Sequence, residues 1–318
     1  MDHLRSLRVF AQVVAEGSFA GAARTLDFAP AVVTRAVSEL EDHLGVRLLN
    51  RTTRSLALTE VGEAYLVSTK RVLAELADAD ALVSAVNGAP RGNLRILCPP
   101  AFATHQLVPH LPAFRHQFPG IQLELLAAGP VAAADENFDV SIVSVGQQSL
   151  QGDFVVRQLA TSTFIVCAAP AYLARRGPVQ HPQDLIEHDG LLPDVTAVRR
   201  ELTLYCESQG LAPSARQVLK VSLNPPVMST SQLEVLYAAA LAGMGVAGLP
   251  TFMVVDALRD GRLQRVLPGW HGGALQLYAA MPSRKHVPKR TRVFIDFLVK
   301  TFGGSQADPW LANINAYL

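Results

Sequence analysis

A stretch near the start of the chain, SFAGAARTLDFAPAVVTRAVSELEDHLG (Ser18–Gly45), restricts the possible folds more than any other part of the sequence. Its apolar residues recur at helical spacing in two groups, and Pro30 separates these groups. Each group is too short to form a stable helix alone in water, so both must be held by tertiary packing. A preceding helix, with Phe10 and Val14 on its apolar face, supplies a packing partner.

The two short helices have clear boundary signals. Ser18 is suited to cap the first of them, and Pro30 suits the first turn of the second, where a missing N–H costs nothing. Three short helices with an angled last pair predict a helix-turn-helix. The face of the last helix that points away from the apolar stripe is small and polar, and it carries Ala31, Thr34, Arg35 and Ser38. Such a face fits a DNA major groove, where Arg35 is long enough to reach a base or a phosphate.

A basic segment follows the second helix. Residues 43–59 contain Arg47, Arg51 and Arg54 but no acidic residue. The alternation from Arg54 to Thr59 predicts a strand, so we interpret the segment as a wing that places Arg51 and Arg54 against the DNA backbone. The alternative interpretation is a solvated basic hairpin.

A long helix is expected after the cap residue Thr59, with about 28 residues and a length of roughly 42 Å. Its apolar positions alternate gaps of four and three residues, which is typical of a coiled-coil seam. The predicted seam consists of Tyr65, Thr69, Val72, Leu76, Ala79, Val83 and Val86. It predicts that two chains pair, and the alternative is a helix that packs on its own globular domain.

The remaining two-thirds of the chain alternate strands with helices, which predicts open α/β sheets. Hydrophobic residues make up 49% of the chain, and the net charge of +1 means that any nucleic-acid site must be local. The uncharged run from Val235 to Val255 contains glycines and Pro250, which favour a helix, a turn and a buried strand over a membrane span. No apolar signal segment follows Met1, so a cytoplasmic location is expected.

Enzyme signatures are missing from the sequence. It contains no GxSxG, phosphate loop or HExxH motif, and its three cysteines lie far apart, so we predict no catalytic residues, no metal site and no cofactor. The motif GMGVAG (Gly243–Gly248) follows a helix and precedes a strand, which is the reverse of the dinucleotide-binding order. The alternatives to a DNA-binding regulator are an α/β enzyme with a helical appendage and a pure ligand-binding protein.

The segment from LRVFAQVVAEG to LTEVGEAYL resembles the N-terminal module of LysR-type transcriptional regulators. The resemblance rests on the pairs Ser18–Phe19, Ala22–Ala23 and Leu40–Glu41, on Arg35, and on LGVRLLNRT and LTEVGE. Five later segments extend the resemblance to nearly the whole chain. They are FPGIQLEL, AAPAYLARRG, HPQDLIEHDGLL, AAALAGMGVAGLP and GRLQRVLPGW. One departure is Ala29, which stands where the family usually has a serine that caps the recognition helix and touches phosphate.

The resemblance implies an α/β fold with an N-terminal winged helix-turn-helix and an effector domain of two α/β lobes, similar to periplasmic binding proteins. The implied domains are residues 1–59, a linker and dimerisation helix at 60–92, an effector domain at 93–302 and a tail at 303–318. Lobe I would take residues 93–160 and 267–302, and lobe II residues 161–266. The implied partners are double-stranded DNA at an interrupted palindrome, a small-molecule effector, further copies of the chain as a dimer or tetramer, and RNA polymerase.

Effector-binding residues are predicted at the carboxyl ends of strands, because ligands of open α/β sheets bind in the crevice there. The candidates are Pro100, Ala101, Phe102, Thr104, Gly146, Gln147, Thr161, Thr163, Met228, Ser229 and Thr230. Many family members carry an arginine where this chain has Val143–Ser144, so we expect a neutral or weakly polar molecule. The alternative is that these residues merely cap strands and loops.

Overall fold

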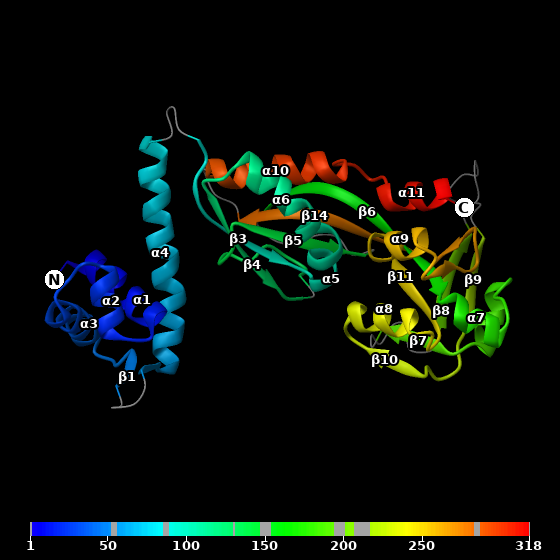
Figure 1. Cartoon of the computed structure of the whole chain (residues 1–318), viewed down its shortest axis with the longest axis horizontal. Coiled ribbons are helices and arrows are strands. Elements are labelled where there is room, and N and C mark those ends of the chain that lie inside the picture. Colours follow the sequence, from blue (N-terminus) through cyan, green and yellow to red (C-terminus); the bar gives the residue numbers. More distant parts are fainter. Residues whose placement is uncertain are drawn as a thin grey trace. The chain divides into compact units, whose positions relative to one another are not determined.

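The computed structural model describes residues 2–51, 56–84, 89–129, 131–146, 154–193, 201–206, 217–282 and 287–317 (Figure 1). It divides the chain into two compact units, Met1–Ala89 and Pro90–Leu318. Each unit has its own apolar core, so each is described separately.

The first unit contains four helices and a hairpin in its described part. They are α1 (His3–Glu16), α2 (Phe19–Thr25), α3 (Pro30–Leu44), β1 (Leu49–Arg51), β2 (Leu56–Leu58) and α4 (Glu60–Ser84). The predicted cap of α2 is confirmed, because the Ser18 hydroxyl accepts a hydrogen bond from the Gly21 N–H at 2.9 Å. Helix α3 begins at Pro30 as predicted and ends at Gly45, whose φ of 69° lies in the left-handed region. The apolar stripes meet in one core, in which Phe10, Val33 and Leu40 are fully buried.

The start of α4 is fixed against the hairpin by two residues. The Thr59 hydroxyl donates to the Arg47 carbonyl at 2.8 Å and accepts from the Gly62 N–H at 2.9 Å. Gly62 has no room for a side chain, since a Cβ there would lie 2.0 Å from the Leu48 carbonyl oxygen. Only glycine therefore allows the helix to begin this close to the hairpin.

Helix α4 uses part of its predicted seam within its own unit. The Tyr65 ring lies 6.0 Å from the Phe10 ring, and Thr69 is 2% exposed. Tyr65 therefore packs on the helix-turn-helix and Thr69 is buried, and the prediction that they belong to a seam between chains stays a prediction. Val72 is 43% exposed and Leu76 is half-buried, whereas the side chains of Ala79 and Val83, and all of Val86, lie outside the described residues.

The second unit is built on a nine-stranded mixed sheet in the order β10-β7-β11-β6-β14-β5-β3-β4, with β12 paired to β6. The bounds are β3 (Gly92–Cys98), β4 (Ile121–Ala127), β5 (Val140–Val145), β6 (Phe154–Ala168), β7 (Gly190–Pro193), β10 (Met228–Thr230), β11 (Val246–Pro250), β12 (Gln264–Arg265) and β14 (Ala274–Pro282). A separate sheet pairs β13 (Trp270–His271), β8 (Glu201–Cys206) and β9 (Val218–Ser222). The long strands β6 and β14 connect the two lobes, and the predicted lobe boundary at residue 160 falls inside β6.

Helices cover the sheet on both lobes (Figure 1). They are α5 (Pro100–Phe102), the π-helical turn η1 (Ala103–Leu107), α6 (Val108–Gln117), α7 (Pro170–Arg176), the 3₁₀ turn η2 (Pro182–Glu187), α8 (Leu233–Leu241), α9 (Thr251–Arg259) and α10 (Lys289–Phe302). The uncharged run predicted as helix, turn and strand is α8, a turn at Gly243 and β11, as expected. No helix in the described ranges is long and apolar enough to cross a membrane.

The C-terminal tail, whose role the sequence left open, forms helix α11 (Pro309–Tyr317) and packs on α9 and β6. Trp310 is 6% exposed, and its ring lies 5.9 Å from the Phe252 ring and 6.1 Å from the Phe302 ring. The Trp310 indole N–H donates to the Gln106 side-chain oxygen at 2.8 Å. The tail is therefore part of the core of the second unit.

Candidate nucleic-acid interface and ligand pocket

The predicted recognition face is exposed on α3. Pro30, Ala31, Thr34 and Arg35 are exposed and Ser38 is half-buried, while the opposite side of the helix enters the core. The Arg35 side chain is 81% exposed, and its Nε lies 2.7 Å from Oε1 of Glu39 one turn later. Because an exposed ion pair of this kind contributes little, Arg35 can leave Glu39 for another anion at small cost.

The N-terminus of α3 lacks a side-chain cap. Ala29 occupies the cap position with an extended backbone, and it makes no capping hydrogen bond. Pro30 has no N–H and the Val32 N–H donates to the Ala29 carbonyl at 2.9 Å, so the Ala31 N–H is the first-turn amide placed for another acceptor, and a DNA phosphate is a suitable one.

The predicted wing is an antiparallel hairpin in which Leu49 pairs with Leu58 and Arg51 with Leu56. The strand expected from Arg54 to Thr59 is observed as β2, Leu56–Leu58. Arg54 and the side chain of Arg51 lie outside the described residues, so their predicted backbone contacts stay predictions.

Glu41 holds the hairpin onto α3, a role that was not predicted from the sequence. Its side chain is 2% exposed, and its Oε1 accepts hydrogen bonds from the N–H groups of Leu48 at 2.9 Å and Leu49 at 3.1 Å. Its Oε2 lies 3.1 Å from Nη1 of Arg47. The sequence signal for this role is an acidic residue on the buried face of a helix, because a buried carboxylate requires N–H donors or a cation as partners.

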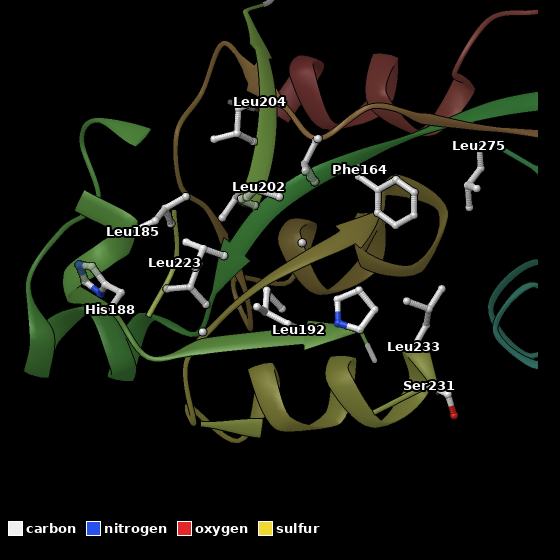
Figure 2. A pocket seen from close by; sticks show the side chains of 18 of the residues that line it. Phe164, Leu185, His188, Leu192, Leu202, Leu204, Leu223, Ser231, Leu233 and Leu275 are labelled. Carbon is white, nitrogen blue, oxygen red and sulfur yellow. The ribbon is translucent and has the colours of Figure 1, made fainter. Parts of the chain in front are cut away.

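A pocket of about 450 Å³ lies in the second unit, between the main sheet and the smaller sheet (Figure 2). Strands β6, β7 and β11 form one wall through residues 164–166, Leu192 and residues 246–248. Leu202 and Leu204 of β8, together with Leu223, contribute from the smaller sheet. Ser231, Leu233 and Leu275 lie at one end in Figure 2, and Leu185 and His188 lie at the other.

The predicted effector residues do not line this pocket. Among those that the structure describes, Ala101 and Phe102 are buried at 7% and 1% exposure in the core, where the Phe102 ring lies 5.5 Å from the Phe252 ring. Pro100, Thr104, Gly146, Met228, Ser229 and Thr230 are exposed or half-buried but are absent from its walls. Gln147 lies outside the described residues.

The tail occupies the crossover where Thr161 and Thr163 were predicted to contact an effector. The Thr161 N–H donates to the Ala307 carbonyl at 3.0 Å, and the Thr163 N–H donates to an Asp308 carboxylate oxygen at 2.7 Å. The Thr251 hydroxyl also donates to Asp308, at 2.9 Å. These bonds correct the prediction, because they commit this edge of β6 to the C-terminal segment.

The pocket residues are close neighbours of the predicted ones. Ser144 stands two residues before Gly146, Phe164 follows Thr163, and Ser231 follows Thr230. Thr163 and Phe164 are successive residues of β6 whose side chains point to opposite faces, so a prediction that is off by one residue there selects the wrong face. The residues predicted from the sequence therefore lie near the pocket but do not line it.

Metal-binding chemistry has no support in the described ranges, where no three histidine, cysteine or acidic side chains are grouped to hold an ion. His105 Nε2 lies 3.1 Å from Glu234 Oε2, and a second acid–histidine pair, His188 and Asp189, is adjacent in the sequence. The Tyr172 hydroxyl lies 3.2 Å from His188 Nδ1 and 3.3 Å from an Asp189 carboxylate oxygen, and it accepts from the Asp189 N–H at 2.8 Å. This network fixes the turn between η2 and β7.

Two family models match the chain. Residues 4–63 match the bacterial regulatory helix-turn-helix protein, lysR family, and residues 87–303 match the LysR substrate binding domain. The HTH-type transcriptional regulator CrgA of Neisseria meningitidis is 35% identical over 305 residues, which cover 94% of this chain and 97% of that protein. The HTH-type transcriptional activator AaeR of Escherichia coli is 32% identical, covering 95% of this chain and 94% of its own.

Solved structures show the same similarity over the full length. The structure of CrgA, described as a LysR-type transcriptional regulator, has a TM-score of 0.58 at 32% identity and covers 94% of this chain and 98% of its own. The Vibrio cholerae virulence activator AphB has a TM-score of 0.57 at 28% identity and covers 94% of this chain and 99% of its own. The helix-turn-helix with its hairpin, the two-lobed second unit and these matches together show that the chain belongs to the LysR family of transcriptional regulators.

Proposed function

We propose that this regulator reads an interrupted palindrome in double-stranded DNA as a homo-oligomer, in the cytoplasm, and that a small molecule bound in its second unit changes its action on transcription. The proposal that the protein reads DNA is supported by the small, polar, exposed face of α3, which is followed by a basic hairpin. A helix of this kind fits the major groove, and the hairpin follows the phosphate backbone.

Each residue of the interface has a proposed task. Thr34 and Arg35 read base edges, while Pro30, Ala31 and Ser38 keep the face small enough to enter the groove. Ser18 orients α2, and Arg51 and Arg54 contact phosphates. In the uncapped first turn of α3, the Ala31 N–H bonds a phosphate in place of the missing serine.

Pairing of two chains is proposed through the part of α4 beyond the helix-turn-helix. Val72 is an exposed valine there, Leu76 follows at heptad spacing, and Ala79 and Val83 continue the same row. A dimer of this kind presents two copies of α3 to two half-sites, and further contacts between second units would build a tetramer. The DNA-bound oligomer is proposed to act on RNA polymerase.

We expect Arg35→Ala to lose sequence discrimination. An arginine that pairs with a guanine contributes roughly tenfold to hundredfold to the preference for the right base. Affinity for a selected operator should fall by that factor, and affinity for random duplex should change little. Fluorescence anisotropy with labelled operator and random duplexes measures both values at one salt concentration.

Arg51→Ala is the matched control, because it removes the same charge from the hairpin. It should weaken operator and random DNA alike and reduce the salt slope of binding by about one unit. Equal losses on the two duplexes for Arg35→Ala would contradict the base-reading role of Arg35.

A further inference from the structure

The pocket in the second unit is lined almost entirely by apolar groups. Phe164, Leu192, Leu204 and Leu223 face it from both sheets (Figure 2). Among the described lining residues, the polar side chains are Ser144, His188 and Ser231, and none carries a permanent charge. A ligand that enters the pocket loses contact with water and gains contact with apolar side chains over most of the ligand's surface.

The pocket is larger than the voids that imperfect packing leaves in a protein interior. Protein interiors are close-packed, and empty spaces larger than a water molecule are few. The pocket measures about 450 Å³, roughly three times the 150 Å³ of an apolar cavity that accepts benzene. Water is held poorly in such a space, because each molecule needs two to four polar partners. The volume therefore suits a molecule of about two to three aromatic rings.

Gly248 supports a ligand at this place. It lies in the middle of β11, paired with Val166 of β6, where a glycine weakens the strand. A Cβ built on Gly248 meets no atom within 4 Å, so the glycine leaves open space rather than room for a neighbouring side chain. Glycine inside a strand often marks the close approach of a ligand.

His188 gives one end of the pocket a polar side chain. Burial of the ring lowers the pKa of His188 below its usual value, and the nearby Arg176 cation lowers it further. The ring is therefore neutral at neutral pH. Its Nδ1 is within hydrogen-bond distance of the Tyr172 hydroxyl, which fixes the ring at this end.

We propose that the pocket between the two sheets binds a neutral, mainly apolar molecule of about two to three rings, and that this class of molecule is the effector. Among the described lining residues no side chain carries a permanent charge, so the pocket stabilises an ion poorly there and favours an uncharged molecule. The assignment rests on the proposed function, since it names the effector of the same regulator. The lining comes mainly from lobe II, with Ser144 and Leu275 from lobe I, and it does not include Thr104, Thr163 or Met228.

Two dyes with one skeleton test the pocket in the full-length chain. N-phenyl-1-naphthylamine is neutral, and 1-anilinonaphthalene-8-sulfonate is the same molecule with an added sulfonate. We expect the neutral dye to bind saturably, one per chain, with increased fluorescence. The sulfonate should bind at least roughly tenfold more weakly.

Two glycine variants locate the dye. Gly248→Leu places a side chain in the open space of the pocket, where a Cβ meets no atom within 4 Å, and should weaken binding of the neutral dye by roughly tenfold or more. Gly146→Leu adds the same side chain where a Cβ also meets nothing within 4 Å, but outside the pocket walls, and should bind the dye like the wild type. Equal dye binding by both variants, or equal affinity for the two dyes, would overturn the proposal.

The effect on DNA separates this proposal from the proposed function. The neutral dye should change the operator affinity of the wild type and of Gly146→Leu, and it should not change that of Gly248→Leu. An unchanged wild-type affinity at saturating dye would overturn the effector assignment. Arg35→Ala should bind the dye normally, so loss of DNA reading and loss of the pocket are measured independently.

Discussion

Trp310→Ala is expected to lower the free energy of unfolding of the second unit by about 3–5 kcal/mol, as deletion of a buried aromatic side chain does. Trp310 belongs to the C-terminal helix α11, yet its ring lies among Phe102, Phe252 and Phe302. These rings come from both lobes and from α10, so the loss leaves a cavity at their junction. The side-chain oxygen of Gln106, which is 7% exposed, also loses the indole N–H as its donor.

Trp310→Phe is the matched control. It keeps most of the ring packing and removes the indole N–H, so we expect it to cost about 1–2 kcal/mol. Urea unfolding of the full chain, followed by circular dichroism, gives both values. A loss below about 1 kcal/mol for Trp310→Ala would show that α11 is not part of the core.

Glu41→Ala is expected to destabilise the first unit by about 2–4 kcal/mol, because it leaves the buried N–H groups of Leu48 and Leu49 without their acceptor. The hairpin should then separate from α3. Hydrogen exchange reports this directly, since the amides of Leu48 and Leu49 should exchange faster than those in the middle of α1.

Glu41→Gln separates the geometry from the charge. The amide oxygen of glutamine can accept the same two N–H bonds, so the variant should lose less stability than Glu41→Ala. It also removes the ion pair with Arg47, whose side chain is 70% exposed and contributes little. Unchanged exchange of both amides in Glu41→Ala would contradict this role of Glu41.

The helix-turn-helix was predictable because its signals are local. Ser18, Pro30 and Gly45 mark helix boundaries within a few residues of the backbone groups that they affect. The role of Glu41 was harder to recognise, because its partners lie seven and eight residues away across a turn.

The pocket and the tail were not predictable in this way. The pocket arises where Leu204 of one sheet meets Leu192 of another, and periodicity in sequence does not show which sheets face each other. The role of the tail was open from the sequence, because Asp308 and Trp310 contact Thr251 and Gln106, which are far away in sequence. Such long-range contacts decide which strand ends remain open to a ligand.

The central claim, that two copies of α3 read two half-sites, is tested most directly by the spacing of those half-sites. Affinity of the full chain is measured for its selected palindrome and for duplexes with about 5 or about 10 base pairs inserted at the centre, which turn one half-site by half or one full helical turn. We expect the half-turn insertion to weaken binding by roughly tenfold or more and the full-turn insertion to weaken it less. Equal affinity for all three duplexes would contradict the claim.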